Sequence, residues 1–109
     1  MKSNLPYSWI RKTVGEILQE LGDPNISLVS WQTAMSFDDT LTDRDCGFYF
    51  DTHIAINPRQ LWTKALNTIW HEIGHVLYPD MPHWWINLYA SWHSGYDYYG
   101  RKAIIRRLK

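Results

Sequence analysis

Apolar residues in the first third of the chain are spaced as in a helix and then as in a strand. They recur every three or four positions across residues 7–22, which predicts an amphipathic helix that ends at Gly22. The next apolar run, from Ile26 to Trp31, is rich in β-prone residues and predicts a strand. Residues 35–46 are polar and acidic, so we expect a loop there.

Two short β-prone runs follow this loop, at 47–50 and 53–57. Only Asp51 and Thr52 separate them, so they form either a tight hairpin or one long bent strand. His53 opens the second run, and we expect it at a sheet edge, exposed to solvent or facing a substrate.

A longer helix is predicted over residues 58–78. Asn57 can cap it, Pro58 suits its first turn, and Pro79 ends it because proline cannot continue the hydrogen-bond ladder. Its apolar stripe comprises Trp62, Leu66, Ile69, Ile73, Val76 and Leu77.

Two more helices are expected at 82–92 and at 98–108. The full order predicts one α+β domain over residues 1–109. It has an N-terminal helix, a short sheet with an edge strand, a long central helix and two final helices.

Composition narrows the class of protein further. The formal net charge is zero, so no overall attraction to nucleic acid or to a membrane surface is implied. A single cysteine, Cys46, excludes an internal disulfide framework and is expected to be a small buried residue. The N-terminus has no apolar signal region and the chain has no run long enough to span a bilayer, which favours a cytoplasmic protein without membrane partners.

The central helix carries the pattern HExxH at residues 71–75. On a helix, His71 and His75 lie one turn apart on the same face and can bind one Zn²⁺. Glu72 is then placed to take a proton from a zinc-bound water, which suits the hydrolysis of a peptide bond. Because a shuffled chain of this composition would contain the pattern in only roughly 0.6% of cases, a zinc site is the favoured interpretation.

A catalytic zinc ion needs a third protein ligand, and no glutamate follows Glu72. We favour His83, because the turn between Pro79 and Pro82 can return the chain to the metal. The alternatives are His93, then Asp97, and then Asp80.

A phenol could stabilise the oxyanion of a tetrahedral intermediate. Tyr96 is the preferred candidate because it lies near the possible third ligands, although each tyrosine in this part of the chain is more often a packing residue. The other candidates are Tyr78, Tyr89, Tyr98 and Tyr99.

Residues 47–93 resemble the zincin superfamily of metallopeptidases in the run GFYFDTHIAINP, the helix LWTKALNTIWHEIGHVLYP and the turn after it. The likeness is to small single-domain members, namely minimal gluzincin-like, SprT-like and ImmA-like proteins of phages and mobile elements. It implies zinc-dependent cleavage of a peptide or protein substrate, which pairs with an edge strand before the helix. In such proteins the position of His83 is commonly Glu, whereas an SprT-like arrangement would favour His93.

Two other functions remain open from the sequence. Basic residues in the predicted last helix, including Arg101 and Arg106, could bind nucleic acid or an acidic protein, although cations at a helix C-terminus more often balance its dipole. Alternatively, four histidines (His71, His75, His83 and His93) could close a purely structural zinc site.

Overall fold

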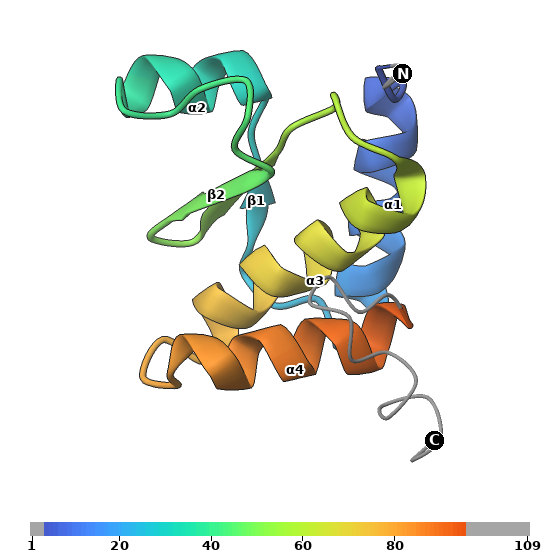
Figure 1. Ribbon diagram of the computed structural model, residues 1–109. Helices are drawn as coiled ribbons and strands as arrows, with labels where there is room; N and C mark the ends of the chain where they lie inside the picture. Colours follow the sequence, from blue (N-terminus) through green and yellow to red (C-terminus); the bar gives the residue numbers. More distant parts are fainter. Residues whose placement is uncertain (1–3, 96–109) are drawn as a thin grey trace.

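The predicted α+β class is confirmed in the computed structural model, which describes residues 4–95. These residues form four helices and one three-stranded mixed sheet (Figure 1). The predicted helix at 98–108, and with it Tyr96 and Asp97, lies outside the described residues. The possible nucleic-acid surface on that helix therefore stays a prediction.

The first helix, α1, spans Tyr7–Glu20 and is slightly shorter than expected. It buries Ile10, Val14 and Ile17 on one face, in agreement with the predicted apolar spacing. The helix stops because the backbone turns into the left-handed region, with φ of +84° at Gly22 and +56° at Asp23.

The prediction of a strand over residues 26–31 is mostly wrong. Strand β1 covers only Ser27–Leu28, and a helix that the sequence did not predict, α2, spans Trp31–Phe37. The side chain of Ser30 accepts a hydrogen bond from the backbone N–H of Thr33 and so caps this helix. Burial of Trp31 and Ala34 against the sheet then stabilises the helical conformation.

The two central β-prone runs form a hairpin, with β2 at Gly47–Phe50 and β3 at His53–Ile56. The strand order is β1-β3-β2, with β3 parallel to β1 and antiparallel to β2. Since β3 is paired on both sides, the expectation that residues 53–57 form an edge strand is wrong. The edge strand next to the central helix is β2.

Helix α3 begins later than predicted and spans Trp62–Leu77, so Asn57 is not its cap. Asn57 is 2% exposed and its side-chain amide donates to the carbonyl oxygens of Asp43 and Asp45, at 2.8 and 2.7 Å. Its Oδ1 accepts the backbone N–H of Arg59. Asn57 therefore ties the acidic loop to the segment that leads into α3.

One main core lies between α1, α3, α4 and one face of β3, while α2 covers the opposite face of the sheet. Side chains along β3 alternate accordingly: Ile54 and Ile56 enter the main core and Ala55 faces α2. Trp62 was predicted in the apolar stripe but is 58% exposed. Trp70, further along α3, is instead buried in the main core.

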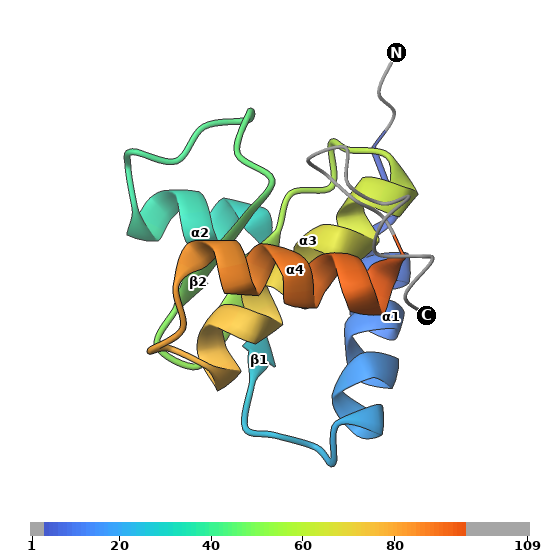
Figure 2. The same ribbon diagram turned by 60° about the horizontal axis from the view of Figure 1, so that its bottom comes forward.

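The last described helix, α4, spans His83–Ser94 and packs along α3 (Figure 2). Pro82 precedes its first turn, and Gly95 ends it with φ of +73°. The two helices approach closely at Gly74, where a Cβ atom would lie 3.0 Å from the ring of Tyr89. Among the described residues, no helix is both long and apolar enough to cross a membrane.

Candidate metal centre

The two histidines of the HExxH motif on helix α3 direct their ring nitrogens toward each other. The Nε2 atoms of His71 and His75 are 3.0 Å apart. Two nitrogens that bind one tetrahedral Zn²⁺ at about 2.0–2.1 Å lie about 3.3 Å from each other. The pair therefore fits a shared metal ion with only a small adjustment.

His83 at the start of α4 completes a three-histidine cluster. Its ring centroid lies 5.0 Å from that of His71 and 5.2 Å from that of His75. One ligand nitrogen from each of these residues can be chosen so that all three lie within 4.8 Å of one another. The short turn after α3 brings α4 back along it, so the favoured third candidate stands beside the motif.

The other candidate ligands that the structure describes, His93 and Asp80, are not part of this cluster. His93 lies ten residues after His83, about 15 Å along the helix, and its ring stacks on Trp70 with centroids 4.2 Å apart. The group of side chains that could hold a metal ion contains neither His93 nor Asp80. A closed four-histidine site is therefore not formed.

The histidines are held in the state that a metal requires. Burial, and then the charges of His75 and His83, lower the pKa of His71 to about 4. Burial, and then the charge of His83, lower the pKa of His75. Both rings are consequently neutral at pH 7, with lone pairs available for coordination.

Glu72 is buried on the side of α3 that meets strand β2. It is 7% exposed, and burial raises its pKa to about 8. Its carboxylate fills the space beside Gly47 of β2, where a Cβ atom would lie 2.6 Å from Oε2. The absence of a side chain at Gly47 therefore lets the strand and the carboxyl group approach each other.

Tyr49 is a site residue that sequence reasoning missed. Its ring lies flat on that of His75, with centroids 4.5 Å apart and an interplanar angle of 10°. The strand pattern placed Tyr49 two residues from Gly47, on the same face of β2, but gave no sign that this face meets the motif helix. The stacking contact restricts the orientation of a candidate ligand.

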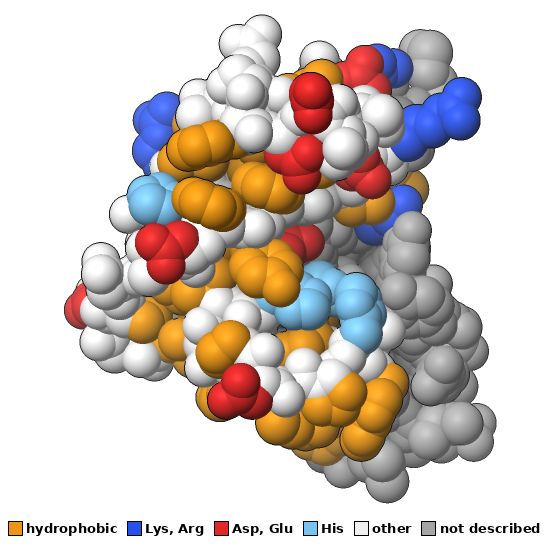
Figure 3. All heavy atoms as spheres, turned by 90° about the vertical axis from the view of Figure 1, so that its left-hand side faces the viewer, with side chains coloured by type: hydrophobic (Ala, Val, Ile, Leu, Met, Phe, Trp, Pro, Cys, Tyr) orange, Lys and Arg blue, Asp and Glu red, His pale blue; other side chains and the backbone are white. Residues whose placement is uncertain are grey.

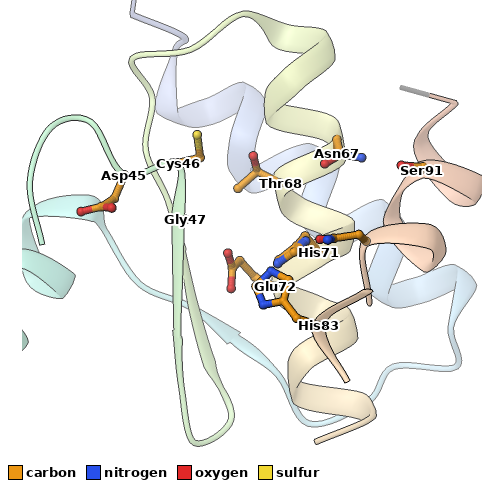
Figure 4. Close-up of a pocket in the computed structure, with 10 residues that line it drawn as sticks. Asp45, Cys46, Gly47, Asn67, Thr68, His71, Glu72, His83 and Ser91 are labelled. Carbon is orange, nitrogen blue, oxygen red and sulfur yellow. The ribbon is translucent and has the colours of Figure 1, made fainter. Parts of the chain in front are cut away.

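The cluster lies at a pocket of about 330 Å³ between β2, α3 and α4. Figure 3 shows histidine side chains together on this face, with hydrophobic side chains around them. Figure 4 shows Glu72 between β2 and the histidines. The pocket is lined by Asp45, Cys46, Gly47, Asn67, Thr68, His71, Glu72, His83, Asn87 and Ser91. Cys46, expected to be buried, is only half-buried because it borders this opening.

The tyrosines that the structure describes do not line this pocket. Tyr78 and Tyr89 contact each other, with centroids 5.5 Å apart, and both contact Trp85. Burial and the neighbouring Tyr78 raise the pKa of Tyr89 to about 12. These two residues are packing residues, and Tyr96, the preferred oxyanion candidate, lies outside the described residues.

Comparisons with known proteins identify no relative of this chain. No family model matches the sequence, and no curated protein and no solved structure matches it.

Proposed function

We propose that this chain is a zinc-dependent metallopeptidase with a zincin-like active site. The observation that carries this proposal is the convergence of His71, His75 and His83 on one point, with the Glu72 carboxyl group buried beside them. Three imidazoles and an adjacent carboxyl group are the donor set of a catalytic zinc site, in which a fourth position stays open for water or substrate.

The three histidines would hold the ion, and binding would require only a small change in their geometry. The two on α3 are neutral at pH 7 and one turn apart, while exposed His83 can adjust its rotamer to close the set. Zinc, when bound, supplies positive charge that polarises a carbonyl group and favours the ionised form of both a water molecule and the Glu72 carboxyl.

Glu72 is the general base in this proposal. It accepts a proton from the attacking water as the water oxygen forms a bond to the peptide carbonyl carbon. When the C–N bond breaks, Glu72 returns that proton to the departing amine, so the carboxylate is regenerated. Its burial against Gly47 supports this role, because a fixed carboxylate in a site shielded from solvent loses no energy in reorienting.

Strand β2 is the candidate platform for an extended substrate. It lies at the end of the described sheet, and Gly47 and Tyr49 on one of its faces contact Glu72 and His75. A peptide that adds to this edge by backbone pairing would run past the histidine cluster. The neighbouring strand β3 is paired on both sides and so has no free edge for a substrate.

The test measures zinc content and peptide turnover in the wild type and in Glu72→Gln. We expect the purified wild type to bind one equivalent of zinc and to cleave members of a fluorogenic peptide mixture. Glu72→Gln should retain the zinc but lose turnover, because the amide cannot accept the proton.

Glu16→Gln is the matched control, since Glu16 is an exposed residue of α1 far along the chain from the site. It should behave as wild type in both measurements. Peptide cleavage that persists in Glu72→Gln, or a wild type that binds zinc but cleaves no peptide, would contradict the proposal.

A further inference from the structure

The pocket continues from the histidine cluster along the groove between α3 and α4. His83, Asn87 and Ser91 follow one another at intervals of four residues, so they share one face of α4. On α3, Asn67 and Thr68 lie one turn before His71 and line the same pocket. Figure 4 shows Thr68, Asn67 and Ser91 displaced from the histidines toward one end of the groove. This end of the pocket is lined by neutral polar side chains.

Among these polar groups, the side-chain oxygen of Asn87 can accept a hydrogen bond that the fold does not supply. Oδ1 of Asn87 is buried and has no hydrogen-bond partner among the described residues. By contrast, the hydroxyl group of Thr68 donates to Oε1 of Gln60 and to the carbonyl oxygen of Lys64, at 3.1 and 3.0 Å. A buried carbonyl oxygen without a partner is unfavourable, so its presence in a pocket indicates a place for a ligand donor.

The charge of this part of the pocket is close to neutral. Among the residues that the structure describes, no lysine or arginine lines it. Asp45 belongs to the lining, but its Oδ2 accepts the backbone N–H of Thr42, and Figure 4 shows the carboxylate directed away from Glu72 and the histidines. A charged substrate side chain would therefore lose its hydration without gaining an opposite charge. A neutral side chain with both a donor and an acceptor is the better match.

We propose that Asn87 selects a peptide substrate with a carboxamide side chain, Gln or Asn, in the pocket next to the histidine cluster. Oδ1 of Asn87 accepts an N–H from the substrate carboxamide, and the polar groups around Ser91 provide the complementary surface. The inference rests on the proposed peptidase activity and adds its specificity. Asn87 is the residue that determines this preference.

The experiment measures cleavage of peptide mixtures by the zinc-loaded full chain. Each mixture varies one position among Gln, Asn, Met, Leu, Glu and Lys, and mass spectrometry gives the relative kcat/KM. We expect Gln or Asn to be favoured over Met or Leu by about tenfold at one position near the cleaved bond. Asn87→Leu, which has a similar size, should remove that preference, so that the ratio of kcat/KM for the Gln peptide to kcat/KM for the Met peptide falls to about one.

Asn87→Asp is a second test of the same preference, because aspartate has nearly the shape of asparagine but carries a charge. Its carboxylate should shift the preference at that position from Gln to Lys, because a cation now gains a partner. Leu88→Asn is the matched control, because exposed Leu88 lines a different groove of α4. It should keep the wild-type preference.

The outcomes separate this inference from the peptidase proposal. Cleavage without a carboxamide preference, or a preference unchanged in Asn87→Leu and Asn87→Asp, overturns the role of Asn87 and leaves the peptidase proposal intact. A zinc-loaded protein that cleaves no peptide overturns both. A second readout uses zinc-loaded Glu72→Gln: a Gln peptide should shift the NMR signals of the Asn87 side-chain amide, and a Met peptide should shift them much less.

Discussion

The carboxylate of Glu72 occupies the space in which residue 47 would carry a side chain. A Cβ atom on Gly47 would lie 2.6 Å from Oε2 of Glu72 and 2.6 Å from Cγ2 of Thr68, closer than real Cβ contacts allow. The edge strand and the motif helix are therefore brought together at the residue that the proposed mechanism uses as its base. Glu72 can occupy this position only because Gly47 of the neighbouring strand has no side chain.

Gly47→Ala should accordingly reduce activity without removing the metal. The added methyl group displaces Glu72, and a displacement of about 1 Å at a catalytic group costs on the order of a hundredfold in rate. We expect kcat/KM to fall by about that factor while zinc content stays at one equivalent. Gly15→Ala is the control, because a Cβ atom at Gly15 of α1 meets nothing within 4 Å. It should raise stability by about 0.5–1 kcal/mol and leave activity unchanged. An active Gly47→Ala would show that Glu72 tolerates displacement.

The buried carboxyl group of Glu72 should make the metal-free protein less stable as the pH rises. Its pKa is about 8 in the folded chain against an ordinary value of 4.5, so between these values the folded state binds more protons than the unfolded state. Stability therefore falls with pH across this window, by up to about 1.4 kcal/mol per pH unit. His71, with a folded pKa of about 4 and an ordinary value of 6.5, acts in the opposite direction, but only below pH 6.5.

The clearest window for this effect is thus pH 6.5–8. In the presence of a chelator, urea unfolding should show a stability advantage of Glu72→Gln over wild type that grows with pH across this range. Parallel stability curves for the two proteins would mean that the carboxyl group is not held neutral by burial.

Zinc binding should distinguish His83 from His93. His83→Ala removes a candidate ligand, so its zinc affinity should fall by more than the roughly 10–100-fold that loss of an outer-shell partner costs. His93→Ala should keep one equivalent of zinc and lose the ring contacts with Trp70 and Tyr89, a loss of about 1 kcal/mol of stability. Metal content and competitive titration of the two variants provide the measurement. Zinc loss in His93→Ala alone would favour the SprT-like arrangement.

Tyr49 should support zinc binding through its contact with His75. Loss of the stacked ring in Tyr49→Ala frees the imidazole to rotate, and an aromatic pair is worth about 0.5–1.5 kcal/mol, or roughly a two- to tenfold decrease in zinc affinity. Tyr49→Phe keeps the ring and should bind zinc as wild type does. Equal affinity in Tyr49→Ala and Tyr49→Phe would show that the stacking does not orient the ligand.

Asn57 should contribute to stability rather than to chemistry. Asn57→Ala leaves the carbonyl oxygens of Asp43 and Asp45 without their donor, which should lower the free energy of unfolding by roughly 2–3 kcal/mol. Exposed Asn25 is the control, and Asn25→Ala should change this free energy by less than about 0.5 kcal/mol. Chemical denaturation of both variants checks the difference. Similar values for the two would contradict the structural role of Asn57.

Local pattern and tertiary context contributed differently to the fold. The helical spacing of α1 and the two runs that became β2 and β3 were readable because their periodicity and their turn residues agree. The region around Trp31 was misread because a short β-prone run has little periodicity of its own. There, the Ser30 cap and burial of Trp31 against the sheet favoured a helix. Asn57 was misread for a similar reason: an asparagine before a proline resembles a cap until its distant partners are known.

The sequence by itself determined the part of the candidate site that lies on α3. Four-residue spacing on a helix places His71 and His75 together whatever the rest of the chain does, and Glu72 follows from the same turn. Only the tertiary structure decided between His83 and His93, since that choice depends on how α4 returns along α3. It also decided that β2 rather than β3 lies at the edge beside the site, and that Gly47 borders Glu72. These relationships join segments distant along the chain, and long-range packing sets them, because local propensity carries no information about which faces will meet.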